Sequence, residues 1–345
     1  MASHLRSVLP PPLTTKLAAL GSRLGQSDDE LKDVLSEISA LPANVIVPAS
    51  REIATAIRFG WWREQNGFLL SPLFGRASST PQLLKNNADY AWLFLFHPSG
   101  YARETALDSI DTPPTSSFFF SALAWRLNDW VPPVRQAAER CVKRVLHRIA
   151  AEIAANGALY LLDRRLVWGR WSDEPEVLDS VFSREDVIAA LAVQLRERST
   201  GPLATCLRNT FRYPNVDEHL PRLAAAAVQP SVRAVAYQCL IFGKASWSVG
   251  FEWAWIDKVY GLRKRVPILT TRDVRRIRPA ADLIREAVDD ESPFVRRVAA
   301  DALIAVRSQL PDEEALIARL ANDPSSAIRS RADYMLRHPS SGQTS

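Results

Sequence analysis

The chain has 345 residues, of which 47% are hydrophobic and 23% charged, and its formal net charge is +5. This balance is typical of a soluble folded protein, and 13 glycines against many alanines, leucines and arginines favour helix over sheet. The longest uncharged runs fall short of the ~20 apolar residues that span a membrane. The first residues do not resemble a secretory signal, and three widely spaced cysteines exclude a disulfide framework. We therefore expect a cytoplasmic, all-α protein whose positive charge permits an acidic partner without requiring one.

The sequence of the N-terminal part predicts helices that do not follow a regular repeat. Ser27 and Glu30 have the capping-box spacing at the start of a helix over Ser27–Leu41. Pro48–Phe59 has the pattern of a degenerate repeat, with Ser50 in an apolar position. The aromatic-rich segment Arg58–Arg76 fits either the cap of a repeat array or a partner-binding surface.

From Leu95 onward one pattern recurs around five arginines. They are Arg103, Arg135, Arg233, Arg296 and Arg329, spaced by 32, 98, 63 and 33 residues, or close to one, three, two and one units of about 32. An apolar residue or alanine precedes each arginine, alanine stands three residues after it, and an aliphatic residue stands seven after it. These positions lie on one face of a helix, and the prolines and serines upstream mark its start. The pattern predicts five related core-facing helices.

The segment SPFVRRVAADALIAVRSQLPDEEALIARLANDPSSAIRSRADYML (Ser292–Leu336) shows the pattern most clearly, as helix, turn, helix, turn, helix. It resembles the short HEAT repeat, and the resemblance implies an α-solenoid of stacked antiparallel helix pairs. It also implies a polar ladder between repeats, which we assign to Arg103, Asp129, Arg135, Arg233, Asp290, Arg296, Asp323 and Arg329. His97 and Ala227 stand where the ladder would have aspartate, so its continuity is in question there.

Three divisions follow from this pattern. Residues 1–94 are expected to form a helical cap with degenerate repeats, and residues 95–338 the HEAT-like array. Within the array, the repeat register is lost near 154–186 and near 244–278, where we expect irregular insertions. Residues 339–345 are expected to be a disordered tail.

The insertion near 244–278 combines tryptophans with a concentration of positive charge. The residues concerned are Trp247, Trp253, Trp255, Arg263, Lys264, Arg265, Arg272, Arg275, Arg276 and Arg278. Aromatic rings beside cations suit a nucleic-acid backbone with stacked bases. Equally, the tryptophans could fill a gap between repeats while the arginines stay in solvent or pair with carboxylates.

A second basic region follows Arg135. Arg140, Arg144 and Arg148 recur every four residues and so share one helix face, where they repel one another unless an anion lies against them. A solvated outer face would tolerate the same spacing. Further basic and aromatic residues come next along the chain: Arg164, Arg165, Trp168, Arg170 and Trp171. Together the two basic regions are the candidate binding surface.

No motif for catalysis, phosphate binding or metal ligation stands out, so we expect no cofactor, no metal and no enzyme activity. Cys141 and Cys239 follow repeat arginines by six residues, which indicates packing. The leading interpretation is a non-enzymatic scaffold that binds a protein, or nucleic acid, on a curved surface, without membrane contact. The alternative is a DNA-binding enzyme similar to alkylpurine DNA glycosylases, for which Trp168, Trp171 and Asp173 offer suitable residue types.

Overall fold

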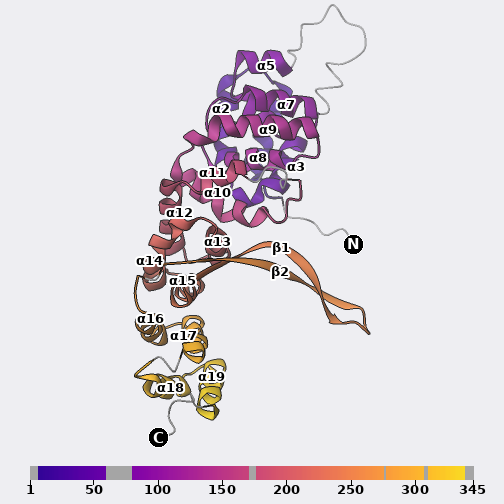
Figure 1. The fold of residues 1–345 in the computed structure, drawn as a ribbon. Helices are drawn as coiled ribbons and strands as arrows, with labels where there is room; N and C mark the ends of the chain where they lie inside the picture. Colours follow the sequence, from indigo (N-terminus) through magenta and orange to yellow (C-terminus); the bar gives the residue numbers. More distant parts are fainter. Residues whose placement is uncertain (1–6, 60–79, 171–175, 276, 307–309, 339–345) are drawn as a thin grey trace, which may run out of the picture. The chain divides into compact units, whose positions relative to one another are not determined.

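The structure is a computed structural model that describes residues 7–59, 80–170, 176–275, 277–306 and 310–338 (Figure 1). These residues are mostly helical, with 18 α-helices and one two-stranded antiparallel sheet. The chain divides into two compact units, unit 1 over Met1–Val187 and unit 2 over Ile188–Ser345. The expectation of a mostly α-helical protein is therefore confirmed, whereas the sheet was not foreseen.

Unit 1 is built from helices that pack in consecutive groups. Its helices are α1 (Pro11–Ser22), α2 (Asp28–Ser39), α3 (Ile46–Ile57), α5 (Thr80–Asn86), α6 (Tyr90–Phe94), α7 (Gly100–Ser109), α8 (Ser117–Leu127), α9 (Pro132–Val145), α10 (Ala151–Arg164) and α11 (Glu176–Phe182), with short 3₁₀ turns at Ala43–Val45 and Leu146–Arg148. Helix α1 packs on α2 and α3, α9 packs on α7 and α8, and α10 packs on α8. The predicted cap of α2 is present, because the Ser27 hydroxyl accepts the N–H of Glu30. The segment Arg58–Arg76 lies almost wholly outside the described residues.

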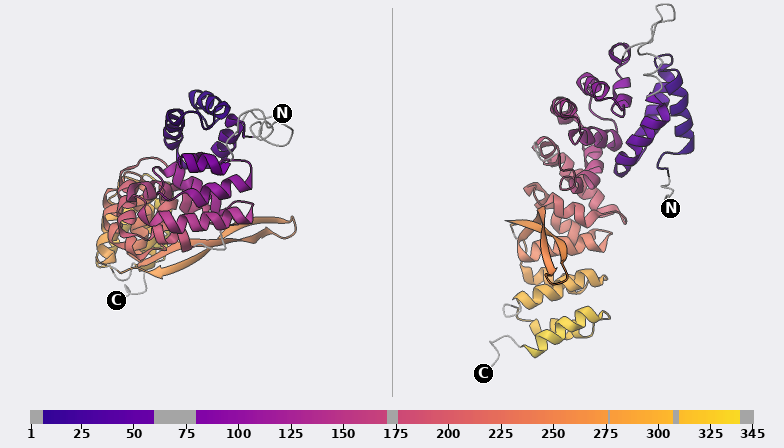
Figure 2. Two further views of the ribbon diagram at one scale, coloured as in Figure 1. Left: turned by 90° about the horizontal axis from the view of Figure 1, so that it is seen from above. Right: turned by 90° about the vertical axis from the view of Figure 1, so that its right-hand side faces the viewer.

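Unit 2 shows the repeat in its most regular form. Helix α12 (Glu185–Glu197) crosses the unit boundary, and α13 (Leu203–Thr210), the 3₁₀ helix η4 (Pro214–His219), α14 (Leu220–Ala226), α15 (Pro230–Phe242), α16 (Ala280–Val288), α17 (Pro293–Val306), α18 (Glu313–Ala321) and α19 (Ser326–Arg337) follow. The arginine-bearing helices pack in series, α15 on α17 and α17 on α19. Each also packs on the helix before it, in the pairs α14/α15, α16/α17 and α18/α19 (Figures 1 and 2). The repeat unit is thus a helix pair.

The recurring apolar pattern marks the core of both units. All five residues before the arginines and all five alanines three residues after them are buried. Seven residues after the arginine, the aliphatic side chain is buried in four repeats, but Leu336 is 61% exposed and Met335 is buried instead. The pattern is wrong at this last position because no described helix follows α19 to cover Leu336.

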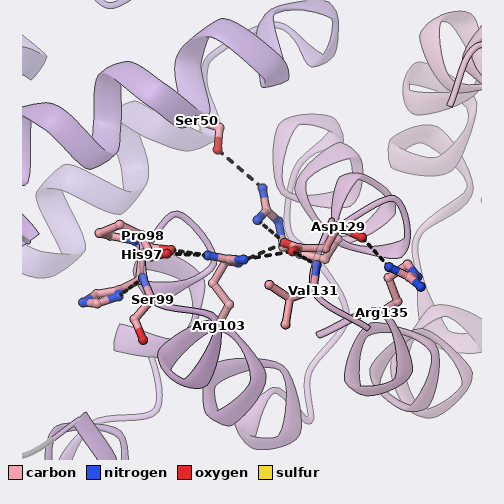
Figure 3. A network of polar contacts seen from close by, with 9 residues as sticks. Ser50, His97, Pro98, Ser99, Arg103, Asp129, Val131 and Arg135 are labelled. Atoms are coloured by element: carbon pink, nitrogen blue, oxygen red, sulfur yellow. Dashed lines mark hydrogen bonds and ion pairs between the residues drawn. The ribbon is translucent and has the colours of Figure 1, made fainter. Parts of the chain in front are cut away.

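Three of the five repeat arginines, Arg103, Arg233 and Arg296, link one repeat to the next. Arg103 donates through Nε and Nη2 to the two carboxylate oxygens of Asp129, at 2.9 and 2.8 Å (Figure 3). The same two-point contact joins Arg233 to Asp290 and Arg296 to Asp323. The partners are 26 and 27 residues apart in the first and third pairs, and 57 apart in the second because the two strands lie between them.

Within each repeat, the arginine also binds its own main chain. Nη1 donates to the carbonyl oxygen six residues earlier in every repeat, namely that of His97, Asp129, Ala227, Asp290 or Asp323. This contact needs no aspartate, which explains why His97 and Ala227 are tolerated. The Nδ1 atom of His97 accepts the N–H of Ser99 (Figure 3). The carboxylate of Asp129 accepts the N–H of Val131 at the equivalent position of the next repeat.

A second arginine joins the pair in unit 1. Arg126 donates to Asp129 at 2.7 Å, and its Nη2 lies 3.5 Å from the Ser50 hydroxyl. Arg103, Arg126 and Asp129 are all buried, so two guanidinium groups share one carboxylate. Burial lowers the pKa of Arg126 to about 10, and the charge of Asp129 opposes this shift. The cluster depends on a single negative charge.

The region near 244–278, expected to be an irregular insertion, is mainly a long hairpin. Strand β1 (Lys244–Asp257) pairs antiparallel with β2 (Leu262–Asp273), in orange in Figure 1. Trp253 and Trp255 alternate along β1, Gly261 adopts φ 65° at the turn, and a β-branched run ends β2. These are strand and turn signals that a search for helical spacing passes over. The other expected insertion, 154–186, contains most of α10, all of α11 and the start of α12 among its described residues, with non-helical residues at 165–170 and 183–184.

Candidate interaction surface on the hairpin

The base of the hairpin is fixed to the helices of unit 2. Gly243 ends α15 at φ 65°, and its carbonyl oxygen accepts the N–H of Val274 at 2.9 Å. Arg272 binds both carboxylate oxygens of Asp217 and donates through Nε to the carbonyl oxygen of Phe211 at 2.7 Å. The strands therefore leave the helices from a defined point.

Beyond this base, the hairpin extends away from the helices of unit 2 (Figure 1). We call the part from Gly250 to Ile268 the hairpin arm. A β-bulge between Ser248 and Gly250 marks where the arm begins. Since an isolated two-stranded ribbon is only marginally stable in water, the side chains along the arm must supply contacts of their own.

Aromatic rings and arginines alternate on one face of the arm. Trp253 pairs with Arg265 and Trp255 with Arg263, and directly paired residues share a face. The guanidinium of Arg263 lies 4.6 Å from the ring centre of Trp253, and that of Arg265 lies 4.0 Å from the ring centre of Phe251. Each arginine thus pairs with one tryptophan and lies over the aromatic ring two residues earlier on β1. We call these five residues the aromatic–arginine face.

The aromatic–arginine face is open to solvent. Trp253 is 59% exposed, Trp255 54% and Phe251 40%. Large aromatic side chains gathered at one exposed place are characteristic of interaction sites. A cation over a ring face is held by the ring quadrupole without using its N–H groups as donors to a carboxylate.

The repeat arginines of the helices bind acceptors within the fold, whereas the cations of the arm lack carboxylate partners among the described residues. Among the residues that the structure describes, no carboxylate binds Arg263, Lys264 or Arg265. The arm contains only two carboxylates, and that of Asp257 accepts the N–H groups of Val259 and Tyr260. A site with stacked rings and unneutralised cations is suited to a partner that carries anions beside apolar groups.

The predicted basic stripe after Arg135 has a different role. Arg140 pairs with Asp108 at 2.9 Å, while Arg144 donates to the carbonyl oxygens of Leu107 and Ile110. Arg148 donates to the carbonyl oxygen of Asp111. All three side chains reach the end of α7 in the preceding repeat, where unpaired helix carbonyls and the dipole attract cations. They tie repeats together and do not form a free basic face.

The residues from 164 to 171 do not form an open aromatic surface either. Trp168 is buried, 6% exposed, with its ring edge-on to Trp125 at 5.0 Å, so its placement on a binding surface was wrong. Arg164 pairs with Asp163 and Arg165 with Asp179. Arg170 is exposed, and Trp171 and Asp173 lie outside the described residues.

The remaining predicted residues surround the base of the hairpin. Trp247 is partly buried, Arg272 is the anchor described above, and Arg278 pairs with Glu286 at 3.0 Å. Arg275 is exposed, and Arg276 lies outside the described residues. The structure thus brings together only the distal members of the predicted basic surface, and adds Phe251, which sequence reasoning missed although it alternates with Trp253 and Trp255.

Features that would support chemistry are not found in the described parts of the chain. No group of three or more histidine, cysteine or acidic side chains could hold a metal ion there. All three cysteines are buried, and burial raises the pKa of the Cys141 and Cys239 thiols to about 12. These thiols are therefore protonated at neutral pH and suited to packing. No described helix has the length and apolar character to cross a bilayer.

Comparison with known proteins returned no similar protein. No family model, no curated protein and no solved structure matches the chain.

Proposed function

We propose that this chain is a non-enzymatic, HEAT-like helical repeat scaffold that binds a protein partner through the aromatic–arginine face of the hairpin arm. The observation that carries the proposal is the exposed, interleaved set of three aromatic rings and two arginines. Tryptophan, tyrosine and arginine dominate the energetic centres of protein–protein interfaces, and this face has that composition.

The helices support the scaffold part of the proposal. Pairs that pack in series and share one arginine contact are the construction principle of solenoids, in which each repeat contacts only its neighbours. In unit 2 the hairpin is inserted in the chain between α15 and α16, and β1 contacts α13 and α15. The stack would hold the arm in a defined direction, which lowers the entropy lost on binding.

The electrostatics of the arm define the partner further. Arg263 and Arg265 would bind carboxylates, while the rings between them bury apolar groups of the same partner. Binding should then weaken as salt is added, because salt screens the attraction between the arginines and the carboxylates. The glycosylase-like alternative gains no support, since Trp168 belongs to the core.

Site-specific photo-crosslinking in cells tests the proposal. A photoreactive residue is placed at Leu269, which is 60% exposed beside the aromatic–arginine face, or at Tyr334 on α19, which is 49% exposed. We expect one protein to be crosslinked from position 269, to be absent from position 334, and to be lost when Arg263 and Arg265 are both changed to Ser. The same adducts from both positions, or an adduct that survives the double change, would contradict the proposal.

A further inference from the structure

The tip of the hairpin arm exposes four apolar side chains beside Asp257 and Lys258. Val259 is 89% exposed, Tyr260 78%, Ile256 63% and Leu262 54%. None of these four belongs to the aromatic–arginine face. Ile256 lies at the register irregularity between Trp255 and Asp257, while Val259 and Tyr260 occupy the turn. A flat protein surface would cover one side of such a tip, whereas an apolar medium covers all of it.

Charged groups lie close to the apolar side chains of the tip. Asp257 is the acidic residue nearest the turn, and its carboxylate is directed to the N–H groups of Val259 and Tyr260 at 2.8 and 3.1 Å. Lys258, Arg263 and Lys264 surround the tip, and no carboxylate binds them among the described residues. The end of the arm therefore combines exposed apolar groups with unneutralised positive charge.

Trp255 lies behind the apolar side chains of the tip, at the level of Arg263, with which it pairs. Strand residues rise about 3.3 Å each, which places Trp255 and Arg263 roughly 10 Å behind the turn. Peripheral segments bury apolar groups ~5–10 Å into the headgroup region, and tryptophan and tyrosine favour that level of a bilayer. Lysine and arginine at the same level are attracted by anionic headgroups, at about 1 kcal/mol each. Exposed apolar groups and Lys258 at the turn, with Trp255 and Arg263 behind them, are the residue types that a headgroup region attracts.

We infer that the tip of the hairpin arm, Ile256–Leu262, inserts into the headgroup region of an anionic lipid bilayer. The sequence led us to expect no membrane contact, because it contains no spanning segment; surface insertion needs none. The anchored base lets the tip reach a membrane while the helices of unit 2 stay clear of it (Figure 1). The site goes beyond the proposed function, because Val259 and Tyr260 lie outside the aromatic–arginine face.

Vesicle sedimentation with the full chain tests this inference. The probes are phosphatidylcholine vesicles with and without 30% phosphatidylglycerol. We expect binding to the anionic vesicles, at least tenfold weaker binding to the neutral ones, and weaker binding in high salt. Equal binding to both vesicles, or none to either, would overturn the inference.

Matched variants assign the effect to the tip. The double change Val259→Asp and Tyr260→Asp should lower vesicle binding at least tenfold. The control, Val228→Asp with Tyr334→Asp, introduces the same charges at side chains that are 53% and 49% exposed in the helical part of unit 2, and should bind as the unchanged protein does. Equal losses in both variants would sink the inference.

A conservative pair and an independent readout complete the design. Val259→Leu with Tyr260→Trp should retain vesicle binding, because both changes keep the tip apolar and aromatic. The Asp variant should unfold at the same temperature as the unchanged protein, since both positions are exposed. Crosslinking from position 269 reports on the aromatic–arginine face separately, so a vesicle result that fails while the crosslink persists counts against the membrane inference alone.

Discussion

Arginine has two different surroundings in this molecule. In the helical repeats, Arg103, Arg233 and Arg296 each bind two carboxylate oxygens and a main-chain carbonyl, with little or no contact with water. On the hairpin arm, Arg263 and Arg265 lie over aromatic rings in solvent. A guanidinium without a carboxylate keeps its N–H groups available for other acceptors, whereas the repeat arginines already have theirs.

The difference shows how a basic sequence should be interpreted. The stripe of Arg140, Arg144 and Arg148 has the spacing of a binding face, yet all three reach acceptors in the preceding repeat. Spacing alone does not reveal such acceptors, because they come from another helix. Positive charge indicates a binding site only where the folded chain leaves it unneutralised.

The largest effect is expected at the buried cluster of unit 1. Asp129→Asn should destabilise the protein by about 3–5 kcal/mol, because two buried arginines lose the one carboxylate that binds them among the described residues. Unfolding in urea measures the change. The control is Asp108→Asn, whose exposed pair with Arg140 should contribute less than about 1 kcal/mol. Similar losses in the two variants would remove the distinction between buried and exposed pairs.

A smaller and more local effect is expected at the base of the hairpin. Arg272→Met should cost roughly 1–3 kcal/mol, since it leaves Asp217 and the Phe211 carbonyl without their donor. Amide hydrogen exchange should become faster in β1 and β2 but not in α17 and α19. Uniform acceleration over unit 2 would show that the anchor supports the helices as well.

Acid should weaken the contact between Arg296 and Asp323. The hydrogen bond from Arg296 lowers the pKa of Asp323, and the N–H of Ser325 and the nearby positive charges add to this. A carboxylate with a lower pKa in the folded state contributes stability above its unfolded pKa near 4, and this is lost as the pH falls through the folded value. Melting temperatures between pH 7 and pH 3 should therefore fall less steeply in Asp323→Asn, from a lower starting value.

The smallest effect on stability belongs to the arm. Arg263→Ser should cost no more than about 1 kcal/mol, the range of an exposed cation–π contact. The same change, combined with Arg265→Ser, should abolish the crosslink from position 269. Thermal unfolding and crosslinking on one preparation measure both quantities. A large loss of stability would show that Arg263 supports the fold, as the repeat arginines do.

Local patterns predicted much of the helical part. The cap at Ser27, the helix starts before the repeat arginines and the buried alanines follow from residue types and their spacing along one helix. Arg103, Asp129 and the later pairs were assigned by resemblance to a family, and the geometry shows which arginine meets which aspartate. The hairpin was missed because this segment was interpreted by its positive charge. The alternation of its aromatic residues, which is typical of a strand, was not considered.

Residue types and their periodicity were enough to indicate a helical protein built from repeats, because helix formation and the apolar stripe are local properties of the chain. Which cations stay available depended on long-range contacts: acceptors for Arg140 and Arg272 come from 32 and 55 residues away. Exposure of Trp253 and burial of Trp168 are likewise set by packing between distant elements. An identical side chain therefore becomes a structural contact or a binding group according to what the fold places beside it.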